Sequence, residues 1–219
     1  YHQDGYADGI AIIMAVTKKA GHDVRYLRIM KKSDYYLVDK TAKEFMPDVV
    51  GFTSVSSQFS VVTDLADIVK KISPKIINVC GGVHPTLYPQ CVLENKSLDL
   101  IFIGESEYPF LDFLEKLKNN QSWKDCDNIA YNDNGNLKKN KLRPLLNNEE
   151  LELLPHPDRT GDAYARTLLK MGYAPFHFTR GCPFTCTYCS NIGIAKVYGH
   201  TRYNIRQASP EYAIQEIEK

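Results

Sequence analysis

The stretch Val49–Thr53, with the sequence VVGFT, is short, apolar and rich in β-branched residues. Such a run is typical of a strand buried in a parallel sheet. A helical pattern of apolar residues follows over residues 58–72, and a second strand pattern covers 75–79. Because a strand, a helix and a strand in this order form a βα crossover, this part of the chain predicts a parallel sheet covered by helices.

The alternation continues on both sides of this segment, so the sequence predicts an α/β fold with a doubly wound parallel sheet over residues 1–125. A helix is predicted at 9–20, ending at Gly21, which suits a left-handed C-cap. The other predicted elements are a strand at 23–29, a helix at 34–45, a strand at 98–103 and a helix at 106–118. Because the first element is a helix, the strand that feeds it would lie before Tyr1, and we expect the chain to be a piece of a longer protein.

Residues 126–175 have a different pattern. A strand at 129–131 and turn residues at 132–136 predict a hairpin, and the proline-containing stretch 143–157 predicts a linker. The last segment, 176–219, contains a strand at 176–179, a cysteine-rich loop and a helix that starts at Ser209. We therefore expect two folded parts joined by a hairpin and a linker.

The composition excludes several classes of protein. The chain has 219 residues, 43% of them hydrophobic and 24% charged, which is typical of a globular protein rather than a disordered one. Its net charge of +1 predicts no nucleic-acid partner. The longest apolar stretch, 10–16, is far shorter than the roughly 20 residues needed to span a bilayer. With no signal peptide pattern at the amino terminus, we expect a cytoplasmic protein with no membrane partner.

Three cysteines lie within eight residues. Cys182, Cys186 and Cys189 have the spacing C-x3-C-x2-C. Thiolates are the usual ligands of iron–sulfur clusters, and a short loop allows three of them to reach three corners of one [4Fe–4S] cube. The fourth iron would then remain open to a ligand or substrate. The alternative is a zinc site with His177 or His200 as fourth ligand, but zinc sites usually combine two separated C-x2-C pairs.

The loop Arg180-Gly181-Cys182-Pro183-Phe184-x-Cys186-x-Tyr188-Cys189 resembles the cluster loop of radical S-adenosylmethionine enzymes. The resemblance implies that the open iron binds S-adenosylmethionine. It also implies that an electron from an external donor, passed through the cluster, cleaves the cofactor to a 5′-deoxyadenosyl radical. Tyr188 would lie near the adenine.

In the same family, strand 176–179 and the helix at Ser209 correspond to the first βα unit of a β/α barrel. The full eight-unit barrel takes about 250 residues. We therefore expect this chain alone to be inactive in the radical reaction, and its incomplete barrel segment to be mobile or non-natively packed.

Over nearly its whole length the chain resembles the subgroup of these enzymes that carries a cobalamin-binding domain before the barrel. The resemblance rests on Gly21-His22-Asp23-Val24, Val50-Gly51-Phe52-Thr53-Ser54, Gly81-Gly82-Val83-His84-Pro85-Thr86, Gly104-Glu105-Ser106-Glu107 and Leu154-Pro155-His156-Pro157-Asp158-Arg159, in this order. It implies that cobalamin is a second cofactor.

Three loops are predicted to form the cofactor rim, because the carboxyl ends of parallel strands meet at one edge of a sheet. The glycines would allow backbone to approach a flat, bulky ligand, although they also suit tight turns with no ligand. Thr53 and Ser54 could donate hydrogen bonds at the same edge. The predicted cofactor-binding residues of the rim are Thr53, Ser54, Val55, Gly81, Gly82, Val83, Gly104 and Glu105.

Many cobalamin proteins supply a histidine to cobalt from an Asp-x-His-x-x-Gly motif. Aligned without gaps, this chain reads Asp4-x-Tyr6-x-x-Gly9, with tyrosine at the histidine position. The hypothesis is that Tyr6 and Gly9 lie at the cofactor and that cobalt takes no histidine from this domain. The alternative is His2, which matches a His-x-x-Gly pattern with Gly5.

The two implied cofactors predict radical methyl transfer to an unactivated carbon or phosphorus centre of a small molecule, or a ring-forming rearrangement. One alternative is a radical S-adenosylmethionine enzyme whose first domain no longer binds cobalamin. Another is a non-enzymatic electron-transfer or zinc-stabilised binding module. Dinucleotide binding and hydrolysis find no support, because no G-x-G-x-x-G follows a strand and no G-x-S-x-G is present.

Overall fold

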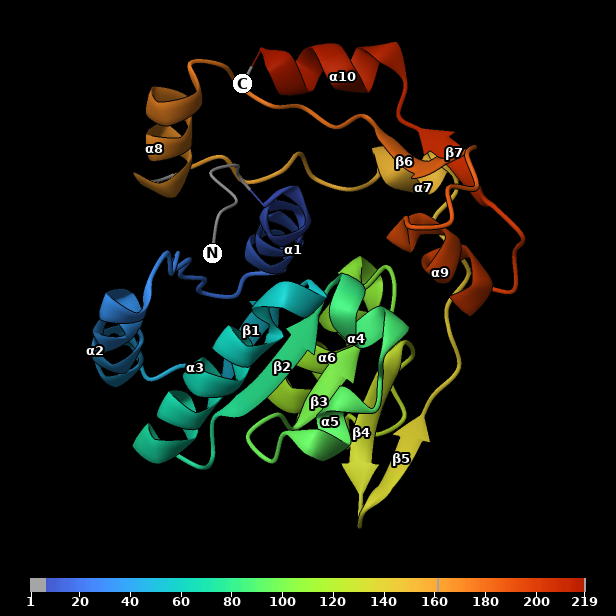
Figure 1. The fold of residues 1–219 in the computed structure, drawn as a ribbon. Helices are drawn as coiled ribbons and strands as arrows, with labels where there is room; N and C mark the ends of the chain where they lie inside the picture. Colours follow the sequence, from blue (N-terminus) through green and yellow to red (C-terminus); the bar gives the residue numbers. More distant parts are fainter. Residues whose placement is uncertain (1–6, 161, 219) are drawn as a thin grey trace. The chain divides into compact units, whose positions relative to one another are not determined.

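The computed structural model describes residues 7–160 and 162–218 (Figure 1). These residues divide into two compact units. The first unit contains residues 26–143. Among the described residues, the second contains 7–25 together with the chain from Pro144 onward.

The first unit is built on a five-stranded sheet in the order β1-β2-β3-β4-β5. Three strands are parallel: β1 (Val49–Thr53), β2 (Ile77–Gly81) and β3 (Leu100–Phe102). The hairpin of β4 (Ile129–Asp133) and β5 (Asn136–Lys139) joins the sheet antiparallel, through pairing of β4 with β3. The predicted hairpin is confirmed, but it extends the sheet instead of belonging to a connecting segment.

Helices cover both faces of this sheet (Figure 1). On one face, α2 (Tyr35–Phe45) and α3 (Phe59–Ile72) pack their apolar side chains against Val50 and Phe52 of β1. On the other face, α6 (Glu107–Lys118) packs Phe113 against Leu100 and Phe102 of β3. The predicted α/β fold with helices on both faces is confirmed. The shorter elements of the first unit are α4 (Val83–Leu87), α5 (Cys91–Glu94), and the 3-10 turns Lys32–Asp34 and Ser56–Gln58.

Two predicted strands differ from the structure. Residues 22–30 form no strand. Leu27 and Ile29 still pack against the cluster formed by α2 and α3, so their alternating pattern reflects packing without strand pairing. The second strand begins at Ile77, because Ile76 is held in the turn after α3 by a hydrogen bond from its N–H to the carbonyl of Ser73.

The second unit contains five helices and a two-stranded sheet among its described residues. The helices are α1 (Asp8–Lys19), α7 (Asn148–Glu152), α8 (Asp162–Met171), α9 (Ser190–Val197) and α10 (Pro210–Ile217). The strand predicted at 176–179 starts later, as β6 (Thr179–Cys182), and pairs antiparallel with β7 (Tyr203–Gln207). Helix α10 starts where predicted, because the Ser209 side chain caps the N–H of Tyr212 and Pro210 occupies the first turn.

Helix α7 lies within the stretch predicted as a linker. Asn147 and Glu150 form a reciprocal capping box, with each side chain accepting the other's backbone N–H. The Asn-x-x-Glu spacing that produces this box is present in the sequence and marks the helix start. No helix in the described part of the chain is long and apolar enough to cross a membrane.

Candidate functional site

The loops after β1 and β2 are joined by backbone hydrogen bonds. The N–H of Ser54 donates to the carbonyl of Gly81 at 3.1 Å, and the N–H of His84 donates to the carbonyl of Ser54 at 3.0 Å. These bonds continue the pairing of the two parallel strands beyond Thr53. The predicted meeting of these two loops at the carboxyl edge of the sheet is therefore confirmed.

Gly82 is required by the neighbouring loop. Its φ of 97° lies in a region that favours glycine, and a Cβ atom there would lie 2.8 Å from the carbonyl oxygen of Ser54 and from Oγ1 of Thr53. The close packing of two protein loops therefore explains Gly82, in place of the predicted close approach of a ligand. A Cβ at Gly81 would meet only Cβ of Phe102, at an ordinary 3.9 Å, so protein packing does not require glycine at that position.

The third loop is tied to the second through a buried hydroxyl. Oγ1 of Thr86 donates to the carbonyl of Gly82 at 2.7 Å and accepts the N–H of Gly104 at 2.9 Å. Thr86 is only 4% exposed. Gly104 has a φ of 74°, which explains the glycine after β3. All three predicted loops are thus connected into one rim.

Asn128, which the sequence did not indicate, holds the loop after β3 in place. The amide of Asn128 donates to the carbonyls of Ile103 and Glu105 at 2.9 and 2.8 Å, and its oxygen accepts the N–H of Arg143 at 2.6 Å. The guanidinium of Arg143 lies 4.7 Å from the ring centroid of Tyr108. Asn128 is buried and has a φ of 60°. Its two hydrogen bonds hold the loop after β3, although no local sequence motif marks this position.

The predicted rim residues differ in their exposure to solvent. Thr53 is exposed, Val55, Gly81, Val83 and Gly104 are partly exposed, and Glu105 is half-buried. Ser54 is 2% exposed, and its hydroxyl donates to the carbonyl of Val55 at 2.8 Å. The Ser54 hydroxyl is therefore used within the protein, whereas Thr53 is an exposed residue whose Oγ1 lies beside Gly82.

His84 lies in an aromatic setting directly after the rim glycines. Its Nδ1 lies 3.1 Å from Oγ of Ser56, and its ring is 4.2 Å from that of Phe59 and 5.8 Å from that of Tyr88. Its Nε2 is buried without a hydrogen-bond partner in the described part of the chain. Burial lowers the pKa of His84, and the Glu94 carboxylate opposes that shift.

The predicted cobalt-facing segment is described only in part. Tyr6, with Asp4 and the alternative His2, lies outside the described residues. Gly9 lies in the first turn of α1, where a Cβ would meet no atom within 4 Å. The assignment of Tyr6 and Gly9 stays a prediction.

The cysteine loop runs from the end of β6 to the start of α9. Cys182 ends β6 next to an irregularity in strand pairing, and Gly181 has a φ of 91°. The N–H of Cys189 donates to the carbonyl of Cys186 at 3.0 Å, which forms a turn directly before α9. Cys186 is exposed, Cys182 and Cys189 are partly exposed, and all three are free thiols. Tyr188 is 91% exposed.

The structure does not gather these thiols as ligands of one ion. In residues 7–160 and 162–218, no group of three or more His, Cys, Asp or Glu side chains is placed to hold a metal ion. The donor chemistry of three free thiols on one short loop suits an iron–sulfur cluster, but their convergence on it stays a prediction. Of the histidines considered for zinc, His177 pairs with Asp8 at 2.6 Å and His200 lines a separate pocket.

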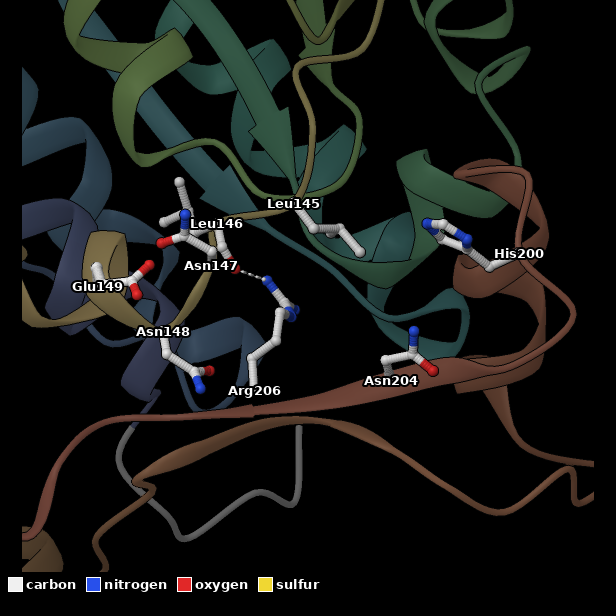
Figure 2. Close-up of a pocket in the computed structure, with 8 residues that line it drawn as sticks. All are labelled: Leu145, Leu146, Asn147, Asn148, Glu149, His200, Asn204 and Arg206. Atoms are coloured by element: carbon white, nitrogen blue, oxygen red, sulfur yellow. Dashed lines mark hydrogen bonds between the residues drawn. The ribbon is translucent and has the colours of Figure 1, made fainter.

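Figure 2 shows this pocket, an open cavity of about 380 Å³ in the second unit. Arg206 crosses it, is 9% exposed and donates from Nη1 to the carbonyl of Leu146 at 2.8 Å. The other lining residues are Leu145, Asn147, Asn148, Glu149, His200 and Asn204. Asn147 caps α7, and the side chain of Asn148 accepts the N–H of Gln207. These two lining side chains are therefore part of the local structure.

Comparison with known proteins places the rim within a family. The model of the B12 binding domain matches residues 1–114. Among curated proteins, the uncharacterized methyltransferase PH0819 of Pyrococcus horikoshii is 28% identical over 221 residues, which cover 96% of this chain and 47% of that protein. The anaerobic magnesium-protoporphyrin IX monomethyl ester cyclase of Rubrivivax gelatinosus is 30% identical over 180 residues, which cover 78% of this chain and 31% of that protein. The chain thus spans less than half the length of these relatives.

The fold also matches a solved structure. The cobalamin-dependent S-adenosylmethionine radical enzyme OxsB, solved with aqua-cobalamin and S-adenosylmethionine bound, superposes with a TM-score of 0.78 at 21% identity, over 97% of this chain and 28% of that one. This likeness shows the shared fold. The family match covers all three loops of the rim, and the chain therefore belongs to the family of proteins with a B12-binding domain.

Proposed function

We propose that the rim formed by residues 53–55, 81–83 and 104–105 holds cobalamin, and that the chain is the amino-terminal part of a radical S-adenosylmethionine enzyme. The observation that carries this proposal is the B12-binding match over the same residues that join three βα loops at one sheet edge. The cysteine loop, together with the similarity to PH0819 and the shared fold with OxsB, supports the radical enzyme assignment.

The rim residues suit a large, flat ligand. Protein packing leaves room at Gly81, since a Cβ there would make only one ordinary contact. The exposed Thr53 offers a hydroxyl to polar groups at the ligand's edge. When bound, cobalamin would supply methyl-group or redox chemistry, and the chain's part would be to bind and orient it.

Cys182, Cys186 and Cys189 are proposed to hold a [4Fe–4S] cluster that binds S-adenosylmethionine. Their partial or full exposure leaves the thiols accessible, and Tyr188 is exposed beside them for contact with the adenine. Three thiolates would bind three of the four irons of the cluster and leave the fourth iron open to a further ligand. An external electron donor would then be the natural partner.

For the intact enzyme we propose methyl transfer to a small-molecule substrate, supported by the similarity of nearly the whole chain to PH0819, which is described as a methyltransferase. Ring formation is the second candidate, because the similarity to the Rubrivivax gelatinosus cyclase covers 78% of the chain. Residues outside this chain would decide between the two reactions.

The cobalamin proposal is tested by anaerobic titration of the full-length protein with hydroxocobalamin, followed by gel filtration and visible absorption. Gly81→Ala should weaken binding while leaving the stability unchanged. Gly51→Ala is the matched control, because Gly51 lies in the middle of β1 and a Cβ there would make one ordinary contact, 3.7 Å from Val79.

Stoichiometric co-elution, lost or weakened in Gly81→Ala alone, supports the rim as the cobalamin site. Wild-type protein that binds no cobalamin would instead favour a domain that has lost its cofactor. Iron and sulfide analysis after anaerobic reconstitution tests the cluster separately, with the triple replacement of Cys182, Cys186 and Cys189 by alanine as the control.

A further inference from the structure

The open cavity of the second unit, shown in Figure 2, is lined by none of the predicted cofactor residues. Its lining residues come from two stretches of the same unit, 145–149 and 200–206. Its volume of about 380 Å³ lies within the range typical of small-molecule sites, roughly 300–1,000 Å³. The side chains that line the cavity decide which chemical class of ligand it fits.

Arg206 is the buried charge of this cavity. It is 9% exposed, and its Nη1 donates to the carbonyl of Leu146 at 2.8 Å, which holds the guanidinium in place. The one carboxylate among the described lining residues belongs to Glu149, which is exposed in the first turn of α7. Water and salt screen an exposed charge more strongly than a buried one, so Arg206 dominates the charge that a ligand meets. The cavity therefore favours a negatively charged ligand.

Two further polar side chains face the same space as Arg206. Asn204 and Arg206 are two positions apart in β7, so their side chains lie on the same face of the strand. Figure 2 shows both rising from β7 toward the segment of Leu145 and Leu146, with the ring of His200 facing them. His200 and Asn204 are exposed, and neither side chain makes a hydrogen bond or ion pair with another described residue. Both are therefore available as donors to a bound ligand.

The two asparagines at the start of α7 add donors to the lining. Oδ1 of Asn147 accepts the N–H of Glu150 at 2.8 Å, and Oδ1 of Asn148 accepts the N–H of Gln207 at 3.0 Å. Because a backbone N–H can donate only to the oxygen of a side-chain amide, these bonds fix both oxygens and leave the NH2 groups as donors. Asn147 and Asn148 thus strengthen the preference of the cavity for a ligand that accepts hydrogen bonds.

We propose that this cavity binds a small organic anion, with its carboxylate or phosphate group at Arg206 and a short apolar part against Leu145. A planar guanidinium can donate two parallel hydrogen bonds to such a group, and charge-assisted hydrogen bonds are roughly twice as strong as neutral ones. Asn204 and His200 donate to the same group and set its orientation. Leu145 is partly exposed at the cavity and offers the ligand an apolar contact. Neither cobalamin nor an iron–sulfur cluster takes part in this site.

The test is saturation-transfer NMR on the full-length protein, with butyrate and butyl phosphate as the two anionic probes. We expect transfer to at least one anion, and the stronger binder identifies whether the cavity prefers a carboxylate or a phosphate. We expect none to 1-butanol, which has the same apolar chain without the charge.

Two substitutions at the exposed Asn204 locate the bound anion. Asn204→Asp adds a carboxylate to the lining and should weaken the affinity by about fivefold or more, the effect of two unit charges about 4 Å apart in water. Asn204→Lys adds a cation and should strengthen the affinity by a similar factor. Titration of the probe against each variant measures the change.

Gln207→Glu is the matched control, because it places a negative charge on the other face of β7, outside the cavity lining. Equal weakening by Asn204→Asp and Gln207→Glu would overturn the proposal, since the binding would then follow the net charge of the protein. Transfer to 1-butanol as strong as to the anions would overturn it as well, because charge would not select the ligand. Absence of transfer to both anions would equally refute the site.

Discussion

The backbone N–H of Gly104 donates to Oγ1 of Thr86 at 2.9 Å, and the same hydroxyl donates to the carbonyl of Gly82 at 2.7 Å. One buried side chain therefore joins the loops that follow β2 and β3. Since Ser54 joins the loops after β1 and β2 in turn, the rim is a connected network in which a local change affects all three loops.

Thr86→Val should destabilise the first unit by about 1–3 kcal/mol. Valine has nearly the same shape as threonine but leaves the N–H of Gly104 without its acceptor. The measurement is urea unfolding of the 219-residue chain followed by the fluorescence of Trp123, its single tryptophan, which packs against the sheet core. Thr86→Ser keeps the hydroxyl and should lose less stability. Equal losses in both variants would show that the methyl group matters as much as the hydrogen bonds.

Gly82→Ala should be more destabilising than Gly135→Ala, although both glycines have positive φ, of 97° and 89°. A Cβ at Gly135 meets no atom within 4 Å, so that variant carries only backbone strain of about 1–3 kcal/mol. At position 82 the new Cβ would also displace the backbone of Ser54. The difference between the two midpoints of urea unfolding measures this close approach, and identical midpoints would contradict it.

The stability of the first unit should depend on pH through His84. Burial lowers the pKa of His84 below its ordinary value of 6.5, so the unfolded chain binds more protons than the folded chain in this range. Stability should therefore decrease as the pH falls from above 6.5 towards the lowered pKa. His84→Gln removes the titrating ring and should flatten that part of the profile of Trp123-monitored unfolding. An unchanged slope in the variant would assign the pH dependence to other groups.

The sequence pattern predicted most of the sheet, because β1, β3 and the flanking helices have strong apolar periodicity. It failed at 23–29, where Leu27 and Ile29 alternate because they pack on α2 and α3 and not because a neighbouring strand pairs with them. An alternating pattern of apolar and polar residues indicates which side chains are buried. Strand pairing depends instead on which segment of the chain lies beside the strand.

The same limit applies to the rim. The positions of the three loops followed from strand order, but the reason for Gly82 is contact with Thr53 and Ser54, which lie far away in sequence. Asn128 holds Ile103 and Glu105 from more than twenty residues downstream, and no local motif marks it. Interactions between distant segments require the structure.

Cysteine alkylation should divide the six thiols into two groups. Cys80, Cys91 and Cys126 have no exposed surface, and burial raises the pKa of Cys91 and Cys126 to about 12, so few thiolates form at neutral pH. Iodoacetamide should therefore label Cys186 first, then the partly exposed Cys182 and Cys189, as read by peptide mass spectrometry of the native protein.

Anaerobic reconstitution with iron and sulfide should protect Cys182, Cys186 and Cys189 together, because one cluster takes all three thiolates. Full unfolding should then expose all six thiols, which controls for the accessibility of each peptide. Protection of the same three cysteines by zinc alone, with no uptake of sulfide, would favour the zinc-stabilised module. Protection of only one or two of them would contradict a shared cluster at this loop.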